Sequence, residues 1–305
     1  MVYYGLIMLS VMMFGGGFAL QDVYRKKRGS NLKISMESAC MGALAGLIVL
    51  WIVNGWRVEF TWFTLLMATL SAFNGIVFTF CSFKALDSIN LSLFSLFSML
   101  GGMALPFFQG IFFYGEPFTI AKSLCVVFIC IALVLTVEKG QKKKGEIYYV
   151  GIFVLNGMAG VLSKLFTAST FPKTSAAGYT ILIAIVTAVL AGGAWTLLEW
   201  RQKHHKIADN TKETVAENSS ICQKLLWQSY GIGALQGAIN KIANYLLVVA
   251  LVKVDASVQY PMVTGGTMIV STIICFFEEK KPTKREMAAV GLAFLGMLAL
   301  FLIPV

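Results

Sequence analysis

Residues 91–114 read LSLFSLFSMLGGMALPFFQGIFFY, a continuous apolar stretch without a charged side chain. An α-helix needs about 20 residues to cross the hydrocarbon core of a bilayer, so this stretch is long enough for one crossing. A helix that is apolar all round is either deeply buried in a large protein or surrounded by lipid. The stretch therefore predicts a membrane-spanning helix, and the rest of the chain can be compared with it.

The composition of the whole chain favours lipid over a soluble core. Hydrophobic residues make up 57% of the 305 positions and charged residues 13%, against about 45–50% and about 25% in soluble domains. Mean hydropathy is +0.75. These values exclude a soluble globular protein and leave little room for a catalytic domain outside the membrane.

Ten apolar stretches of this kind recur along the chain, separated by short polar breaks. None shows the alternating pattern of a β-barrel strand, so we expect helices, which satisfy their own backbone groups in lipid. The predicted spans are Val2–Val23, Ile34–Val53, Thr61–Phe83, Leu91–Tyr114, Thr119–Val137, Ile147–Thr167, Ser175–Leu198, Leu225–Leu247, Val254–Phe277 and Glu286–Val305.

The net charge of +10 is concentrated in the breaks on one side. Basic residues cluster in Arg25–Arg28, Lys139–Lys144, Arg201–Lys212 and Lys280–Arg285, which follow the first, fifth, seventh and ninth spans. Basic loops of membrane proteins face the cytoplasm. We therefore expect a multi-pass protein of the cytoplasmic (plasma) membrane with both termini outside, and no nucleic-acid partner.

The two halves of the chain resemble each other, which predicts an internal repeat. With five spans in each half, an odd number, the second copy must enter the membrane inverted, an arrangement typical of alternating-access transporters. We expect a first repeat at 1–137, a cytoplasmic linker at 138–146, and a second repeat at 147–305 with a hydrophilic loop at 199–224. The matched positions are Val2-Tyr3-Tyr4 with Ile147-Tyr148-Tyr149, Gly15 with Gly160, Gly101 with Gly266, and Pro117 with Pro282.

Two strings in the first half, Ala85–Ser92 and Gly115–Thr119, are echoed in the second half by Ala250-Leu251 and Glu278–Thr283. In this order the chain resembles the EamA-type transporters of the drug/metabolite transporter superfamily. The resemblance implies a ten-helix transporter of small metabolites or drugs, and it leaves a homodimer open. Family members usually have both termini in the cytoplasm, whereas the charges here place them outside.

The eighth span has the most informative polar residues. Gln236, Asn240 and Asn244 recur every four residues and form one stripe, with Lys241 beside it. Polar side chains within a span are costly and usually face a cavity or another helix. We expect this stripe to bind substrate; for Lys241 the alternatives are snorkelling to the membrane surface, a buried pairing and a misplaced span edge.

Other polar residues within spans extend the candidate substrate site to Asn156, Asn74, Gln21 and Lys164. The alternative for small polar residues is helix packing, and Lys164 lies close enough to a span end to snorkel. Gly233 and Gly237 form a small-xxx-small pair that predicts close helix packing.

Acidic residues within spans are scarce. Two lysines with few acids favour an anionic or zwitterionic metabolite as substrate. The runner-up is a proton-coupled exporter of drugs or organic cations, for which Glu37 would be the coupling carboxylate. A rival from another class is a membrane sensor or scaffold that transports nothing.

Catalysis, metal binding and cofactors are not expected. Both histidines, His204 and His205, lie in the hydrophilic loop, which is better explained as a solvated linker than as a metal site. The six cysteines form no CxxC motif. No residue set combines a nucleophile with a base, so we predict that the protein is not an enzyme.

Overall fold

The structure, a computed structural model, describes residues 2–57, 59–115, 119–136, 146–208, 219–251, 254 and 256–302. These residues form ten α-helices, and the part of the chain that the structure describes contains no strand. The helices are α1 (Val2–Arg28), α2 (Leu32–Val53), α3 (Trp62–Ser88), α4 (Leu91–Tyr114), α5 (Ile120–Thr136), α6 (Glu146–Ala168), α7 (Ala176–Ala208), α8 (Ser219–Leu251), α9 (Ala256–Cys275) and α10 (Lys284–Leu302).

Six of these helices, α1, α2, α3, α4, α6 and α7, are long and apolar enough to cross a membrane by length and composition. The chain is therefore an all-α protein of the multi-pass membrane type, as its composition predicts. Exposed tryptophans support a position in a membrane, because tryptophan is enriched at membrane–water interfaces. Trp56 lies between α2 and α3 and Trp62 begins α3, whereas Trp200 and Trp227 lie on α7 and α8 towards the other end of the molecule.

Several helices extend beyond the predicted spans. The basic run Arg25–Arg28 forms the last turn of α1, where positive charge complements the helix dipole. Gly29 then stops the helix with a positive φ of 95°. Apolar patterning locates the part of a helix that lies in lipid, whereas caps and glycines decide where the helix ends.

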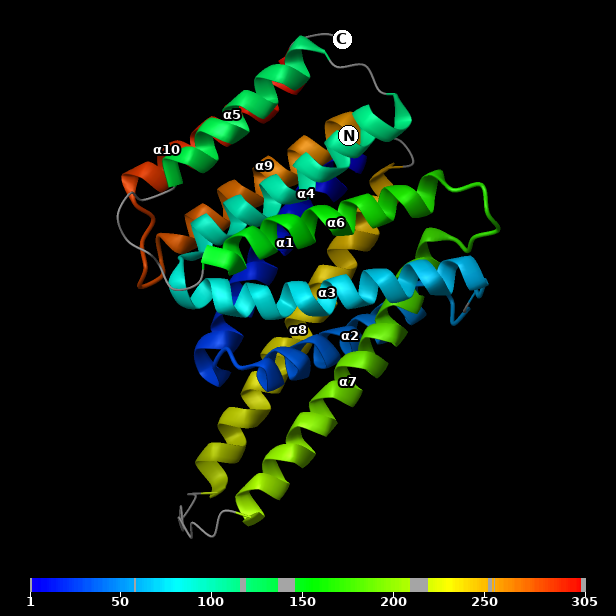
Figure 1. The fold of residues 1–305 in the computed structure, drawn as a ribbon, viewed down its shortest axis with the longest axis vertical. Coiled ribbons are helices and arrows are strands. Elements are labelled where there is room, and N and C mark those ends of the chain that lie inside the picture. Colours follow the sequence, from blue (N-terminus) through cyan, green and yellow to red (C-terminus); the bar gives the residue numbers. More distant parts are fainter. Residues whose placement is uncertain are drawn as a thin grey trace.

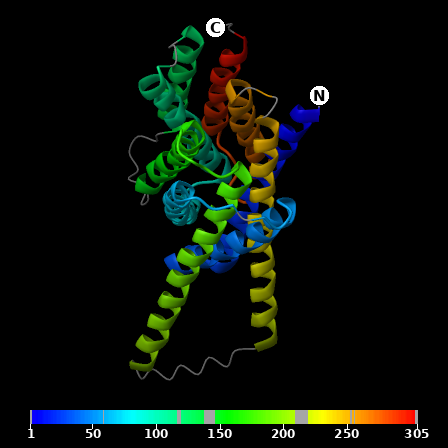
Figure 2. The same cartoon turned by 90° about the vertical axis from the view of Figure 1, so that its right-hand side faces the viewer.

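The expected hydrophilic loop at 199–224 is largely helical. α7 continues to Ala208 and α8 begins at Ser219, so only 209–218 falls outside the described residues. Figure 1 shows α7 and α8 running to the end of the molecule opposite α5 and α10, and Figure 2 shows their far ends well apart. Of the expected linker at 138–146, residues 138–145 lie outside the described residues and Glu146 begins α6.

Helices far apart in the sequence pack together. α1 packs on α8 and α9, and α6 packs on α3 and α4. Three further contacts join α2 with α7, α4 with α9, and α5 with α10. Figure 1 shows the α5–α10 pair at one end, with α4, α9, α1 and α6 beneath it.

Glycines set the closest of these approaches. A Cβ atom on Gly237 of α8 would overlap the backbone of Gly42 on α2, and one on Gly233 would press on the ring of Tyr24. The predicted packing role of the Gly233–Gly237 pair is confirmed. Small residues allow helices in lipid to approach closely, where dispersion contacts replace the hydrophobic driving force.

Replacing Gly237 with alanine should lower stability by about 1–3 kcal/mol, because the new methyl group collides with the Gly42 backbone. Gly231 lies on the same helix with open space around its Cα. Gly231→Ala should therefore raise helix stability by up to about 1 kcal/mol. Thermal unfolding of the two purified variants in detergent checks the opposite signs, and equal shifts would contradict the packing described.

Candidate functional site

The polar stripe of α8 faces two neighbouring helices. Asn240 lies against Gly17 of α1, and the alkyl chain of Lys241 lies against Gly46 of α2. A side chain at either glycine would overlap these groups, so the absence of a Cβ makes room for them. Sequence periodicity places Asn240 and Lys241 side by side on α8, and the structure directs them to α1 and α2 respectively.

The depth of this stripe follows from its neighbours. Gly17 lies near the middle of α1 and Gly46 in the second half of α2, and both helices qualify as membrane-spanning. Lys241 therefore lies beside the second half of α2, a helix long and apolar enough to cross a membrane. A lysine at the centre of a membrane helix costs about 2.5–3.5 kcal/mol on an insertion scale.

The stripe holds polar groups without partners among the described residues. Lys241, which is partly buried, makes neither an ion pair nor a hydrogen bond there, and neither does the Gln236 side chain. The side-chain oxygen Oδ1 of Asn240 is buried and accepts no hydrogen bond in that part of the chain. Buried polar groups are normally satisfied, so this set calls for water or a ligand.

Asn244, the last residue of the predicted stripe, is placed differently. Its side chain is exposed, and its Nδ2 donates to the backbone oxygen of Asn240 on the same helix at 2.8 Å. The structure therefore does not bring Asn244 to the contact between α8, α1 and α2.

Two predicted asparagines connect α6 to its neighbours. Nδ2 of Asn156 donates to the backbone oxygen of Ser98 on α4 at 2.6 Å. Nδ2 of Asn74 on α3 donates to the backbone oxygen of Leu155 at 2.9 Å. In each asparagine, the side-chain nitrogen is thus used for a hydrogen bond between two helices.

The remaining predicted residues lie on α1 and α6. Gln21, one turn beyond Gly17, is 4% exposed, so it extends the buried polar set along α1. Lys164 is partly buried on α6 and has an interaction partner.

Glu37 belongs to a buried cluster between α1, α2 and α8. Its two carboxylate oxygens each accept from Nη2 of Arg28 at 2.9 Å, and Oε1 also accepts from the Tyr24 hydroxyl at 2.7 Å. The Arg28 guanidinium lies 5.6 Å from the centre of the Tyr230 ring. Glu37 is 1% exposed, so this carboxylate is held by a cation and a hydroxyl rather than facing an open path.

A second charged cluster joins the ends of α1, α3 and α9, and sequence reasoning missed it. It consists of Asp22, Arg25, Lys26, Asp87 and Glu278, and we call it the ionic cluster. Arg25 binds Asp22 at 2.7 Å and also binds Asp87, while Lys26 binds Asp22 at 2.7 Å and Glu278 at 3.3 Å. The i, i+3 and i, i+4 spacing from Asp22 signals the local pairs, whereas the pairing with α3 and α9 has no local signal.

At the opposite ends of the helices, hydrogen bonds rather than a cluster of ion pairs join separate segments among the described residues. Glu59, between α2 and α3, accepts from the backbone amide of Ser175 at 2.6 Å. This bond lowers the pKa of the exposed Glu59 carboxyl. Thr64 accepts from the backbone amide of Thr174 at 3.1 Å. Contacts between separate segments thus join the helices at both ends of the bundle.

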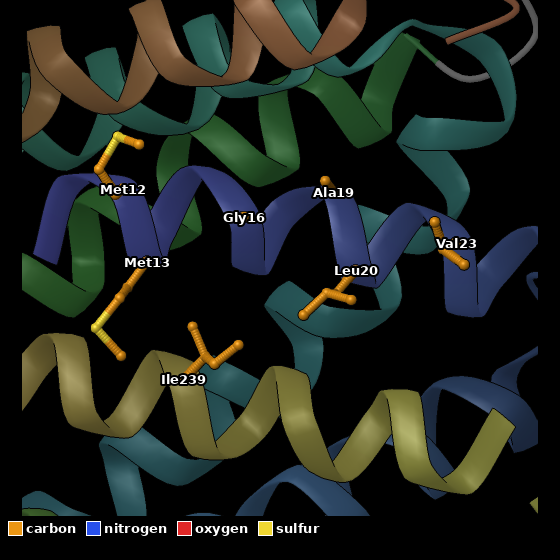
Figure 3. Close-up of a pocket in the computed structure, with 7 residues that line it drawn as sticks. All are labelled: Met12, Met13, Gly16, Ala19, Leu20, Val23 and Ile239. Atoms are coloured by element: carbon orange, nitrogen blue, oxygen red, sulfur yellow. The ribbon is translucent and has the colours of Figure 1, made fainter. Parts of the chain in front are cut away.

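An apolar pocket of about 450 Å³ lies on the outer side of the α1–α8 contact. Figure 3 shows Met13 and Leu20 pointing towards α8 and Ile239, whereas Met12 points away. Its lining contains no polar side chain, so it offers nothing to orient a charged substrate and is separate from the polar stripe.

Comparison with known proteins adds no function. No protein-family model and no curated protein sequence matches the chain. One solved structure, described as "Crystal structure of protein", aligns with 97% of this chain and 99% of its own at 13% identity and a TM-score of 0.48. That likeness is too weak to carry an argument.

Breaking the Arg28–Glu37 pair should destabilise the protein strongly. Arg28→Ala leaves a buried carboxylate without its cation, for which we expect a loss of about 3–5 kcal/mol. Lys27→Ala removes an exposed neighbouring charge and should change stability by less than about 0.5 kcal/mol. Chemical denaturation in detergent measures both, and an Arg28→Ala variant as stable as Lys27→Ala would contradict the account.

Proposed function

We propose that the protein is a secondary transporter of a small anionic or zwitterionic metabolite that works by alternating access between two inverted five-helix halves. The contacts between helices support the repeat. If each helix is replaced by the helix five places away in chain order, the same set of contacts results. α1 on α8 and α9 becomes α6 on α3 and α4, while the α2–α7, α4–α9 and α5–α10 contacts map onto themselves.

The matched glycines support the repeat at the level of residues. Gly15 of α1 approaches Val270 of α9, and its counterpart Gly160 of α6 approaches Pro106 of α4. Gly101 of α4 likewise approaches α6, and its counterpart Gly266 of α9 approaches α1. A side chain at any of these glycines would overlap its neighbour, so each matched pair fulfils the same packing need.

The observation that carries the substrate class is Lys241. A lysine without an acidic partner among the described residues, beside a buried unpaired Asn240 oxygen, is suited to a ligand that brings its own negative charge. Asn240 and Gln236 can then accept from and donate to the polar groups that surround that charge. A carboxylated metabolite that also carries a hydroxyl or ammonium donor satisfies both requirements.

The place and orientation of the transporter follow from its charges. Most of the basic residues lie near or just beyond the ends of α1, α3, α7 and α9. We propose that this basic face lies in the cytoplasm of a plasma-membrane protein, with both termini outside. The motifs shared with EamA-type transporters support the same class of function.

A thermal-shift screen of the purified protein against amino acids, organic acids, nucleosides, sugars and cationic dyes tests the proposal. A carboxylated ligand at about 100 times its Kd should stabilise the wild type by about 2.7 kcal/mol. Lys241→Ala should lose this stabilisation, whereas Lys27→Ala, which removes an exposed lysine, should keep it. An equal shift in Lys241→Ala would contradict the role of Lys241, and a screen without any shift would favour a sensor or scaffold.

The proton-coupled exporter of cations requires Glu37 to bind and release protons. Its bonds to Arg28 and Tyr24 favour a structural role instead. If Glu37→Gln folds and abolishes a proton-gradient requirement for cation export, the exporter replaces the metabolite transporter as the proposed function. Under our proposal no cation export occurs, and Glu37→Gln lowers stability.

A further inference from the structure

The ionic cluster closes the basic face by joining segments far apart in the sequence. Lys26 near the end of α1 links Asp22 of its own helix to Glu278, which follows α9. Beneath the cluster, Leu86, Leu91 and Cys275 are at most 1% exposed. The ionic cluster therefore covers buried side chains at this end of the molecule.

The charges within the cluster do not balance. Three carboxylates, those of Asp22, Asp87 and Glu278, share two cations, Arg25 and Lys26. Asp22 binds both cations at 2.7 Å, whereas Glu278 has one longer contact of 3.3 Å to Lys26. Glu278 is thus the least compensated of the three carboxylates.

The other groups around Glu278 do not supply the missing positive charge. Nζ of Lys280 donates to the backbone oxygen of Asp87, and the Cys275 thiol donates to the backbone oxygen of Lys280. On α10, Glu286 accepts from the Asn90 side chain and from the Thr283 amide. Burial, and then the negative charge of Asp22, raise the pKa of Glu278 against the opposing effect of Lys26.

We propose that Asp22 and Glu278 together form a proton-binding site that holds the basic face closed. The Glu278 carboxylate accepts a proton from hydronium in the adjoining solution and becomes a carboxylic acid, which donates a hydrogen bond to the Asp22 carboxylate. Lys26 keeps its own proton and its bond to Asp22. The cluster then holds two carboxylates against two cations, and the excess negative charge is gone.

The direction of the pH effect follows from linkage. A raised pKa means that the closed form binds the proton more tightly than a form in which Glu278 is solvated. Closure gains its full stabilisation below the ordinary carboxyl pKa and loses it as the pH rises through the raised pKa. In the transporter proposed above, on which this role rests, proton release would favour opening of the basic face.

The natural Cys275, buried directly beneath the cluster, reports opening without a transport assay. We would measure its alkylation by iodoacetamide in the full-length protein by peptide mass spectrometry. Glu278→Gln imitates the protonated acid, since its amide can donate to Asp22. At about pH 8 this variant should react severalfold more slowly than the wild type, and the difference between the two rates should shrink as the pH is lowered towards the ordinary carboxyl range.

Glu279→Gln removes the adjacent exposed charge and should behave as the wild type. Cys125 is 1% exposed and packed beside Gly296 of α10. It should stay unmodified in every variant and therefore serves as a control for correct folding. A Glu278→Gln variant that reacts as fast as the wild type at the higher pH, or faster, would overturn the proposal.

If Glu278→Gln fails to fold, measurements on the wild type alone test the proposal. Its Cys275 rate, divided by that of the denatured chain at each pH, should rise with pH, and a constant ratio would overturn the proposal. Because no substrate is involved, this result is independent of the ligand screen that tests transport.

Discussion

Close approach of helix backbones at glycine is the constraint on which the rest of the structure depends. Lipid gives helices no hydrophobic reason to associate, so their stability comes from packing that only small residues permit. Gly237 against Gly42 fixes α8 on α2, and Gly15 fixes α1 on α9. In this packing the side chains of Asn240 and Lys241 on α8 lie against Gly17 of α1 and Gly46 of α2.

Two kinds of polar group result from this packing. Asn156 and Asn74 use a donor atom on a backbone oxygen of a neighbouring helix, which stabilises the bundle. Lys241 and Asn240 keep groups that no described residue satisfies. Those unsatisfied groups are expensive in lipid, and a protein that retains them gains most when they bind something.

The sequence predicted the helices well because lipid allows few alternatives, and it predicted the Gly233–Gly237 contact from spacing alone. It could not predict helix ends, since Arg28 and Ala208 lie in polar turns that hydropathy assigns to loops. It also could not separate Asn244, which bonds within its own helix, from Asn240 one turn earlier. The bond between Lys26 and Glu278 joins residues 252 positions apart, and only the folded chain reveals such a pair.

The most direct test of the central claim is the aqueous accessibility of position 241. Lys241→Cys, in a chain whose native cysteines are replaced by alanine, would be exposed in membranes to a charged, impermeant thiol reagent. Leu235→Cys, on an exposed apolar face of the same helix, serves as the control. Reaction at position 241 but not at 235 is the result we predict. A position 241 that reacts only with a lipid-soluble reagent would contradict the alternating-access substrate site proposed at Lys241.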